Sequence, residues 1–188
     1  MTEADVLDLL RERGALRSGH FLLSSGKHSP AYVEKARVFE DPQAVVRLGE
    51  AVSARFPGLQ AVISPAVGAL PFGFAVALAG GARFLYAERV DGRMTLRRGF
   101  RLRPGERTAV VEDVVTTGGS AAEVFELVRR SGAEALGVAT LVDRSSGDLP
   151  FPFTALARVD AAVFDPDGCP QCADGVPVES PGSRHVGA

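Results

Sequence analysis

The sequence contains no apolar stretch close to the ~20 residues that a membrane span requires. Its N-terminus, MTEADVLDLLRERG, has acidic residues before the first arginine and lacks the basic region and apolar block of a secretory signal peptide. An excess of one charge is also missing, since the formal net charge is −2. We therefore expect a cytoplasmic protein with no membrane partner and no nucleic acid partner, in which any anion site arises from local geometry.

Cysteine is scarce. Cys169 and Cys172 form a single CPQC pair near the C-terminus, and His185 is the only histidine near them in the sequence. A zinc site would need further ligands, and a redox-active pair normally lies at a strand-to-helix junction. We favour a surface turn with reduced thiols or a local disulfide over zinc, and the sequence alone leaves all three states open.

The remaining composition is that of a globular protein, with 46% apolar and 23% charged residues. A chain of 188 residues fits one domain, and no internal repeat, low-complexity block or linker divides it. We therefore expect a single domain over residues 1–188.

The first part of the chain predicts a helix, a hairpin and a second helix. Thr2 to Asp5 resembles a capping box, and Gly14 would close the helix that follows. FLLSSGKHSPAYVEKARVF (21–39) predicts a strand, a turn and another strand. Asp41 followed by Pro42 suits the start of a helix that runs to Pro57-Gly58.

Farther along, short apolar runs typical of buried strands alternate with helical segments. The expected strands are 61–64, 84–87, 108–112 and 135–142, and a helix is expected from Ser120 to Gly132. This alternation predicts an α/β fold with a mostly parallel sheet covered by helices on both faces. Residues 90–105 are expected to form a long polar loop, and long loops in compact domains are often lids or binding loops.

The segment VVEDVVTTGGS (110–120) is the strongest functional signal. It follows an apolar strand and precedes a helix, which is where parallel α/β sheets bind ligands. Its small residues let backbone N–H groups approach an anion, its hydroxyls add donors, and the helix adds its positive end. We expect a phosphate site that is neither a Walker loop, since the GxxxxGK[ST] lysine is missing, nor a GxGxxG dinucleotide turn.

The adjacent carboxylates Glu112 and Asp113 would repel a phosphate that faced them directly. Carboxylates accept hydrogen bonds from vicinal sugar hydroxyls and bind Mg²⁺ directly or through water. A ligand with a phosphate, a diol and a metal-bound polyanion would therefore match the segment. The alternative is a solvated acidic turn before a helix.

The same segment resembles the motif with which type I phosphoribosyltransferases bind 5-phosphoribosyl-1-diphosphate (PRPP). Four other segments are similar to the orotate-using members of this family: GHFLLSSGKHSPAYVEK (19–35), AERVDGRMTLRRGF (87–100), LVDRSSG (141–147) and CPQCADGVPVESPGSR (169–184). The resemblance covers nearly the whole chain. It implies a Rossmann-like sheet flanked by helices, with a small N-terminal hood (about 1–40 with parts of the C-terminal tail) and a mobile loop at about 88–103.

The resemblance also implies roles for individual residues. Glu112 and Asp113 would bind the ribose hydroxyls and lie near a Mg²⁺ ion that is held mainly by PRPP. The implied PRPP-binding residues are Glu112, Asp113, Val114, Val115, Thr116, Thr117, Gly118, Gly119, Ser120 and Arg89, and the implied catalytic residues are Asp113, Glu112, Arg89 and Arg93. The implied orotate-binding residues are Thr116, Arg144, Ser24, Ser25, Gly26 and Tyr32, with Phe21 also in the hood.

More ordinary roles stay open for some of these residues. Arg144 could be a surface ion-pair residue, although an arginine fork suits the planar carboxylate of orotate. Phe21 and Tyr32 could be core residues of the hairpin.

The chain departs from the family in its lysines, which occur only at Lys27 and Lys35. Gly68 in PAVGALP (65–71), the turn expected to contact pyrophosphate, and Ser24 stand where many members have lysine. The positive charge of the mobile loop must come from arginine, which neutralises diphosphate but does not donate a proton at neutral pH. The loop arginines, which could instead be merely solvated, are Arg89, Arg93, Arg97 and Arg98.

The resemblance implies orotate and PRPP as substrates and a homodimer with shared active sites. Two other functions are weighed against it: a purine phosphoribosyltransferase, and a PRPP-sensing regulator that has lost catalysis. The regulator would need a basic nucleic-acid-binding face, which the net charge of −2 does not favour.

Overall fold

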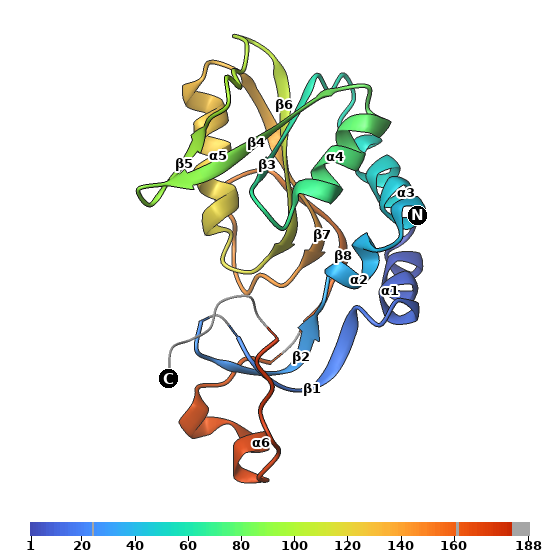
Figure 1. Cartoon of the computed structure of the whole chain (residues 1–188), viewed down its shortest axis with the longest axis vertical. Coiled ribbons are helices and arrows are strands. Elements are labelled where there is room, and N and C mark those ends of the chain that lie inside the picture. Colours follow the sequence, from blue (N-terminus) through green and yellow to red (C-terminus); the bar gives the residue numbers. More distant parts are fainter. Residues whose placement is uncertain (24, 161, 182–188) are drawn as a thin grey trace. The chain divides into compact units, whose positions relative to one another are not determined.

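The computed structural model describes residues 1–23, 25–160 and 162–181 (Figure 1). The chain divides into two compact units. The first unit comprises Met1–Leu7 and Phe39–Val159, and the second comprises Asp8–Val38 and Asp160–Ala188. None of the helices in the described ranges combines the length and the apolar character needed to cross a membrane.

A six-stranded sheet in the order β5-β4-β3-β6-β7-β8 forms the centre of the first unit. Five strands run parallel, and β5 pairs antiparallel with β4 at one edge. The strands are β3 (Ala61–Pro65), β4 (Arg83–Val90), β5 (Arg93–Leu96), β6 (Arg107–Val115), β7 (Glu134–Asp143) and β8 (Phe153–Arg158). The predicted mostly parallel sheet is confirmed, although β5 and β8 were not predicted.

Helices cover both faces of this sheet, as predicted (Figure 1). Helix α4 (Leu70–Ala79) connects β3 to β4, and α5 (Gly119–Arg130) connects β6 to β7 in the opposite direction across the sheet. Right-handed crossovers in opposite directions place their helices on opposite faces. Helix α3 (Pro42–Ser53) packs against α4, and a Cβ atom at Gly49 would lie only 2.6 Å from the carbonyl carbon of Ala75.

Local sequence signals explain where two helices begin. The Asp41 carboxylate accepts hydrogen bonds from the N–H groups of Gln43 and Ala44 at 3.0 and 3.2 Å, and Pro42 occupies the first helical turn. In α1 (Glu3–Glu12) the Thr2 N–H donates to Asp5 Oδ2 at 2.8 Å, and the Asp5 N–H donates to Thr2 Oγ1 at 3.3 Å. Both predicted N-termini are confirmed.

One hydrophobic core cluster lies between the sheet and α5. Every residue of β3 is buried, as expected for a central strand covered on both faces. Ile63 and Val110 from the sheet and Val124 from α5 belong to one cluster, and all three are fully buried. This packing holds the strand ends and the start of α5 in fixed positions.

The second unit is built on the predicted hairpin of β1 (Leu16–Leu22) and β2 (His28–Val33). The C-terminal segment pairs with both strands: the Leu22 N–H donates to the Glu179 carbonyl and the His28 N–H donates to the Phe164 carbonyl, each at 2.8 Å. The short helices α2 (Ala36–Phe39), η1 (Pro166–Gly168) and α6 (Pro170–Ala173) were not predicted.

Three expected boundaries were wrong. Helix α3 ends at Ser53 and not at Pro57-Gly58. Strand β6 does not end at Glu112 but continues to Val115, so the acidic pair lies inside the strand. Residues 90–105 are not one loop, because β4 extends to Val90 and turns at Asp91-Gly92 into β5. Both turn residues have positive φ, 47° and 79°, which is the conformation of a tight two-residue hairpin turn.

Candidate active site

The topology of the first unit singles out one place for a ligand. Strands β3 and β6 are neighbours, and the helices that follow them cross to opposite faces of the sheet. Ligands of open α/β sheets bind beyond the carboxyl ends of the strands at such a switch point. The segments that begin there are 66–69 after β3 and 116–118 after β6.

Glu112 and Asp113 differ in their surroundings because they lie in a strand. Successive side chains of a strand point to opposite faces. Asp113 is buried, with only 4% of its surface exposed, whereas Glu112 is half-buried. Asp113 Oδ1 accepts a hydrogen bond from the Val114 N–H at 2.6 Å, and the Asp113 carbonyl accepts one from Thr140 Oγ1 at 3.0 Å. Neighbouring backbone and β7 therefore hold Asp113 in place.

The residues after β6 form a short turn into α5. Thr116 and Thr117 are exposed, and Gly118 is the buried N-cap of the helix with φ +74°, a left-handed conformation that favours glycine. No side chain of the described residues caps this end of α5. The first N–H groups of the helix have no intrahelical acceptor, so they can donate to an anion. The helix begins at Gly119, one residue before the expected Ser120.

The segment after β3 adds a second turn at the same edge. The Ala66 N–H donates to the Ala87 carbonyl at 2.8 Å, which ties the turn to β4. Val67 and Gly68 are exposed, and the peptide between Ala66 and Val67 is cis. Gly68 can contact a ligand only through its backbone, because glycine has no side chain.

Arg144 is brought next to the end of β6. Val115 and Asp143 are register partners in the parallel pair of β6 and β7, and the Arg144 N–H donates to the Val115 carbonyl at 2.8 Å. Thr116 and Arg144 are therefore each the next residue after a member of this register pair. The Asp143 carboxylate accepts hydrogen bonds from the Ser145 N–H at 2.8 Å and from Arg158 at 2.7 Å, which fixes the backbone around half-buried Arg144.

The four loop arginines lie on or just after the β4–β5 hairpin. Arg89 pairs with both carboxylate oxygens of Glu123 on α5, at 2.9 and 3.1 Å. The hydrogen bond from Arg89 holds the pKa of Glu123 below its usual value. Arg98 pairs with Glu88 at 3.0 Å. Arg93 and Arg97 are exposed, and within the described residues no ion pair engages Arg93.

The hairpin of the second unit carries the other residues that were predicted to bind orotate, besides Thr116 and Arg144. Ser25 is exposed and Gly26 is half-buried, and both lie in the turn between β1 and β2. Tyr32 is half-buried, and its ring lies 5.6 Å from that of Phe21, centroid to centroid. Phe21 is fully buried, so it has the role of a hairpin core residue that the sequence left open for it. Ser24 lies outside the described residues.

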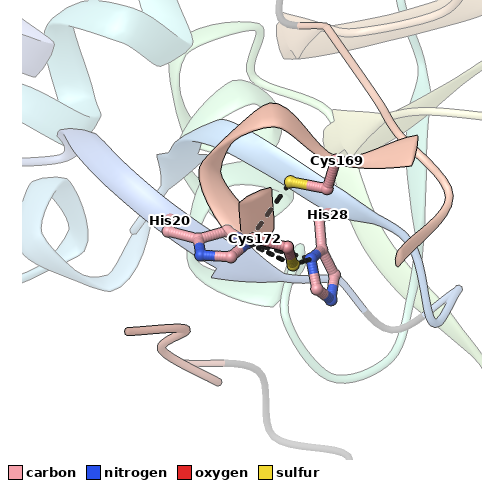
Figure 2. Close-up of side chains that lie close together, drawn as sticks. All are labelled: His20, His28, Cys169 and Cys172. Carbon is pink, nitrogen blue, oxygen red and sulfur yellow. Dashed lines mark hydrogen bonds between the residues drawn. The ribbon is translucent and has the colours of Figure 1, made fainter. Parts of the chain in front are cut away.

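A cluster that was not predicted lies in the same unit. Cys169 and Cys172 come together with His20 and His28, and their potential ligand atoms all lie within 4.8 Å of one another (Figure 2). The cysteines are not disulfide-bonded, and Cys169 is buried rather than on a surface turn. His185, the only histidine close to the cysteines in the sequence, lies outside the described residues. No local pattern links His20 to Cys169, which lies 149 residues farther along the chain.

Comparisons with known proteins show which proteins this chain is similar to. Residues 60–156 match the family model of the phosphoribosyl transferase domain. The orotate phosphoribosyltransferase of Desulforamulus reducens is 46% identical over 190 residues, covering 99% of this chain and 100% of the relative.

Solved structures give the same result for the fold. The structure is similar to that of orotate phosphoribosyltransferase from Aeropyrum pernix, with a TM-score of 0.70 and 28% identity over 82% of this chain and 93% of the other. Adenine phosphoribosyltransferase from Thermoanaerobacter pseudethanolicus matches with a TM-score of 0.67 over 81% of this chain and 99% of the other. Its identity is 16%, so this second likeness concerns the fold alone.

Proposed function

The chain belongs to the orotate phosphoribosyltransferase family, and we propose that it transfers the 5-phosphoribosyl group of PRPP to orotate, giving orotidine 5′-monophosphate and diphosphate. This reaction is a step of pyrimidine biosynthesis. The observation that carries the proposal is the position of Glu112 to Ser120 at the switch point of the sheet, where the segment runs from the end of β6 into the uncapped start of α5.

The turn after β6 would hold the 5′-phosphate of PRPP. The N–H groups at the start of α5 and the exposed hydroxyls of Thr116 and Thr117 supply donors without any lysine. The left-handed conformation of Gly118 lets the chain turn sharply from strand to helix at this point. A phosphate bound here would gain several hydrogen bonds to groups that are already ordered, which limits the entropy lost on binding.

Glu112 and Asp113 would bind the ribose hydroxyls. Two carboxylates at the end of a strand are also the oxygen donors that Mg²⁺ prefers, so the residues present fit this ion. Mg²⁺ bound mainly by PRPP would neutralise the diphosphate that leaves. Asp113 is held by the Val114 N–H, and half-buried Glu112 has the greater access to solvent.

Arg144 would bind the carboxylate of orotate. A guanidinium group binds a planar carboxylate through two parallel hydrogen bonds, and orotate carries such a group where purine bases do not. An orotate ring nitrogen would then attack C1 of the ribose while the C1–O bond to diphosphate breaks and its electron pair leaves with the diphosphate. Orientation of the reactants and stabilisation of the departing charge can each contribute several kcal/mol.

The exposed arginines of the β4–β5 hairpin would stabilise the diphosphate. Because Arg89 is engaged with Glu123, Arg93 is the better candidate of the two predicted catalytic arginines. Closure of residues 88–103 would keep water from hydrolysing PRPP. We also propose a cytoplasmic homodimer with shared active sites, which light scattering and mixing of two inactive variants would test.

A spectrophotometric assay with orotate, PRPP and Mg²⁺ tests the proposed function. Loss of orotate absorbance should require all three components, and adenine or hypoxanthine should not release diphosphate. Asp113→Asn should lower kcat by about 100-fold or more, the scale on which positioned catalytic groups act. Glu126→Gln, which alters a half-buried carboxylate on α5 that pairs with Arg129 and Arg130, is the matched control and should keep normal activity. Turnover with a purine base but not with orotate would overturn the assignment.

A further inference from the structure

Two histidines and two cysteines of the second unit face a common point (Figure 2). His20 lies on β1, His28 begins β2, Cys169 is the N-cap of α6 and Cys172 lies within α6. His20, His28 and Cys169 are buried, and Cys172 is exposed. Four side chains from three elements thus contribute two nitrogens and two sulfurs to one small volume, and the proposed transferase reaction uses none of them.

The distances between these atoms fit a tetrahedral metal site. Zinc bonds of about 2.0–2.1 Å to nitrogen and 2.3 Å to sulfur place a nitrogen about 3.6 Å from a sulfur in a tetrahedron. His20 Nε2 lies 3.5 Å from Cys169 Sγ and 3.7 Å from Cys172 Sγ, and His28 Nδ1 lies 3.2 Å from Cys172 Sγ. The two ring nitrogens are 2.8 Å apart and would have to separate by about 0.5 Å, a small rotation of either ring.

The hydrogen bond of His20 selects the tautomer that a metal-binding histidine needs. Its Nδ1 lies 2.8 Å from the Val176 carbonyl oxygen, which can only accept, so Nδ1 carries the proton. In the neutral ring Nε2 then presents its lone pair to His28, Cys169 and Cys172. Histidines that bind metals commonly donate their other N–H to a backbone carbonyl in this way, which fixes the orientation of the ring.

We infer that His20, His28, Cys169 and Cys172 bind a zinc ion. Two thiolates and two imidazoles form a donor set typical of zinc, and four protein ligands leave no open position for substrate or water. The site is therefore structural rather than catalytic. It goes beyond the transferase activity, because no step of that reaction uses these side chains.

The position of the site explains what a metal would stabilise. It joins the β1–β2 hairpin to α6, which lies about 140 to 150 residues farther along the chain. Other described links between the hairpin and the C-terminal segment include a few backbone hydrogen bonds, the His20 Nδ1 contact with the Val176 carbonyl, the Gln171 side chain bound to the Gly19 carbonyl, and the exposed ion pairs Arg17–Glu179 and Lys27–Asp165. Exposed ion pairs contribute little. A cross-link between distant segments removes many unfolded conformations and stabilises such a small unit.

Metal analysis tests the inference without reference to activity. Wild-type protein, purified under reducing conditions with any affinity tag removed and then dialysed, should contain about one zinc per chain by mass spectrometry. Titration of the two thiols with a mercurial should release that zinc in parallel. The double variant Cys169→Ser/Cys172→Ser should bind zinc at least about 100-fold more weakly, since loss of even an outer partner of a ligand costs 10–100-fold. Asp174→Asn, an exposed change beside α6, is the control and should retain zinc.

Cobalt substitution tests the ligands without any variant that could fail to fold. Wild-type protein that has been stripped of metal and given Co²⁺ should show the strong visible absorption of tetrahedral cobalt and the near-ultraviolet band of cobalt–thiolate charge transfer. The inference is overturned if wild-type protein binds no zinc after reconstitution in reducing buffer, if cobalt shows no thiolate band, or if the double variant keeps its zinc. None of these results depends on whether the protein turns over orotate.

Discussion

Gly118→Ala should destabilise the protein even though it adds only one methyl group. Gly118 has φ +74°, a conformation that costs a residue with a Cβ atom about 1–2 kcal/mol. The new Cβ would also lie 2.7 Å from Leu149 Cδ2. Leu149 is half-buried and its methyl can move, so an off-rotamer shift of about 0.5–1.5 kcal/mol relieves the clash. Alanine also restricts the conformations of the unfolded chain, which stabilises the folded state by about 0.4–1 kcal/mol. The net loss is about 0.5–3 kcal/mol.

Gly119→Ala is the matched control at the next position. A Cβ there meets only Thr117 Oγ1, at an ordinary contact distance of 3.7 Å, and φ is not positive. This variant should therefore be stabilised by about 0.4–1 kcal/mol. Urea unfolding followed by circular dichroism measures both, provided that the m-value stays constant. In thermal unfolding, Tm should fall by about 2–4 °C for each kcal/mol lost in Gly118→Ala, as expected for a chain of this size, and rise slightly in Gly119→Ala. Equal destabilisation of both variants would refute the strained turn.

Three further changes probe the site. Arg144→Ala should raise the KM for orotate by about 10-fold or more, since hydrogen bonds to charged groups contribute about 1.5–3 kcal/mol, and steady-state kinetics that show an equal rise for PRPP would contradict its role. Arg93→Ala should lower kcat more than Arg89→Ala in the same assay, and the reverse order would show that the Glu123 pair opens during turnover. Because the pKa of Glu123 is lowered, its pair with Arg89 stabilises the hairpin fully at pH values above the ordinary carboxyl pKa of 4.5. This stabilisation is lost as the pH falls through the lower pKa that Glu123 has in the folded protein. The Met94 N–H donates to Glu123, so the hydrogen-exchange protection of Met94 should fall by about 1.4- to 5-fold at low pH. Glu123→Gln should cause a fall of the same size at pH 7. Unchanged protection in both experiments would show that the pair does not stabilise the hairpin.

The sheet could be predicted because its information is local. Apolar runs such as 61–64 and 108–112 are short and bounded by turn residues, and the helices between them have clear start and stop signals. The end of β6 was misjudged because residues at the carboxyl end of a strand can be polar without ending it. Strand β5 was missed although Asp91-Gly92 is a strong signal for a two-residue hairpin turn.

The segment that we propose to bind phosphate could be recognised in the sequence for a similar reason. Its residues are contiguous, and strand, small turn and helix follow one another within VVEDVVTTGGS. The partner of Arg89 could not be found this way, because Glu123 lies on α5, 34 residues away. The metal cluster is the extreme case. CPQC contains two of the proposed ligands, but the two histidines lie on the β1–β2 hairpin near the other end of the chain. Only the folded second unit brings the four side chains together.

A crystal structure with PRPP and Mg²⁺ bound tests the central claim most directly. We predict that the 5′-phosphate contacts the backbone N–H groups of residues 117–120 and that the ribose hydroxyls lie against Glu112 and Asp113. Density for the sugar phosphate at any other part of the chain would contradict the account.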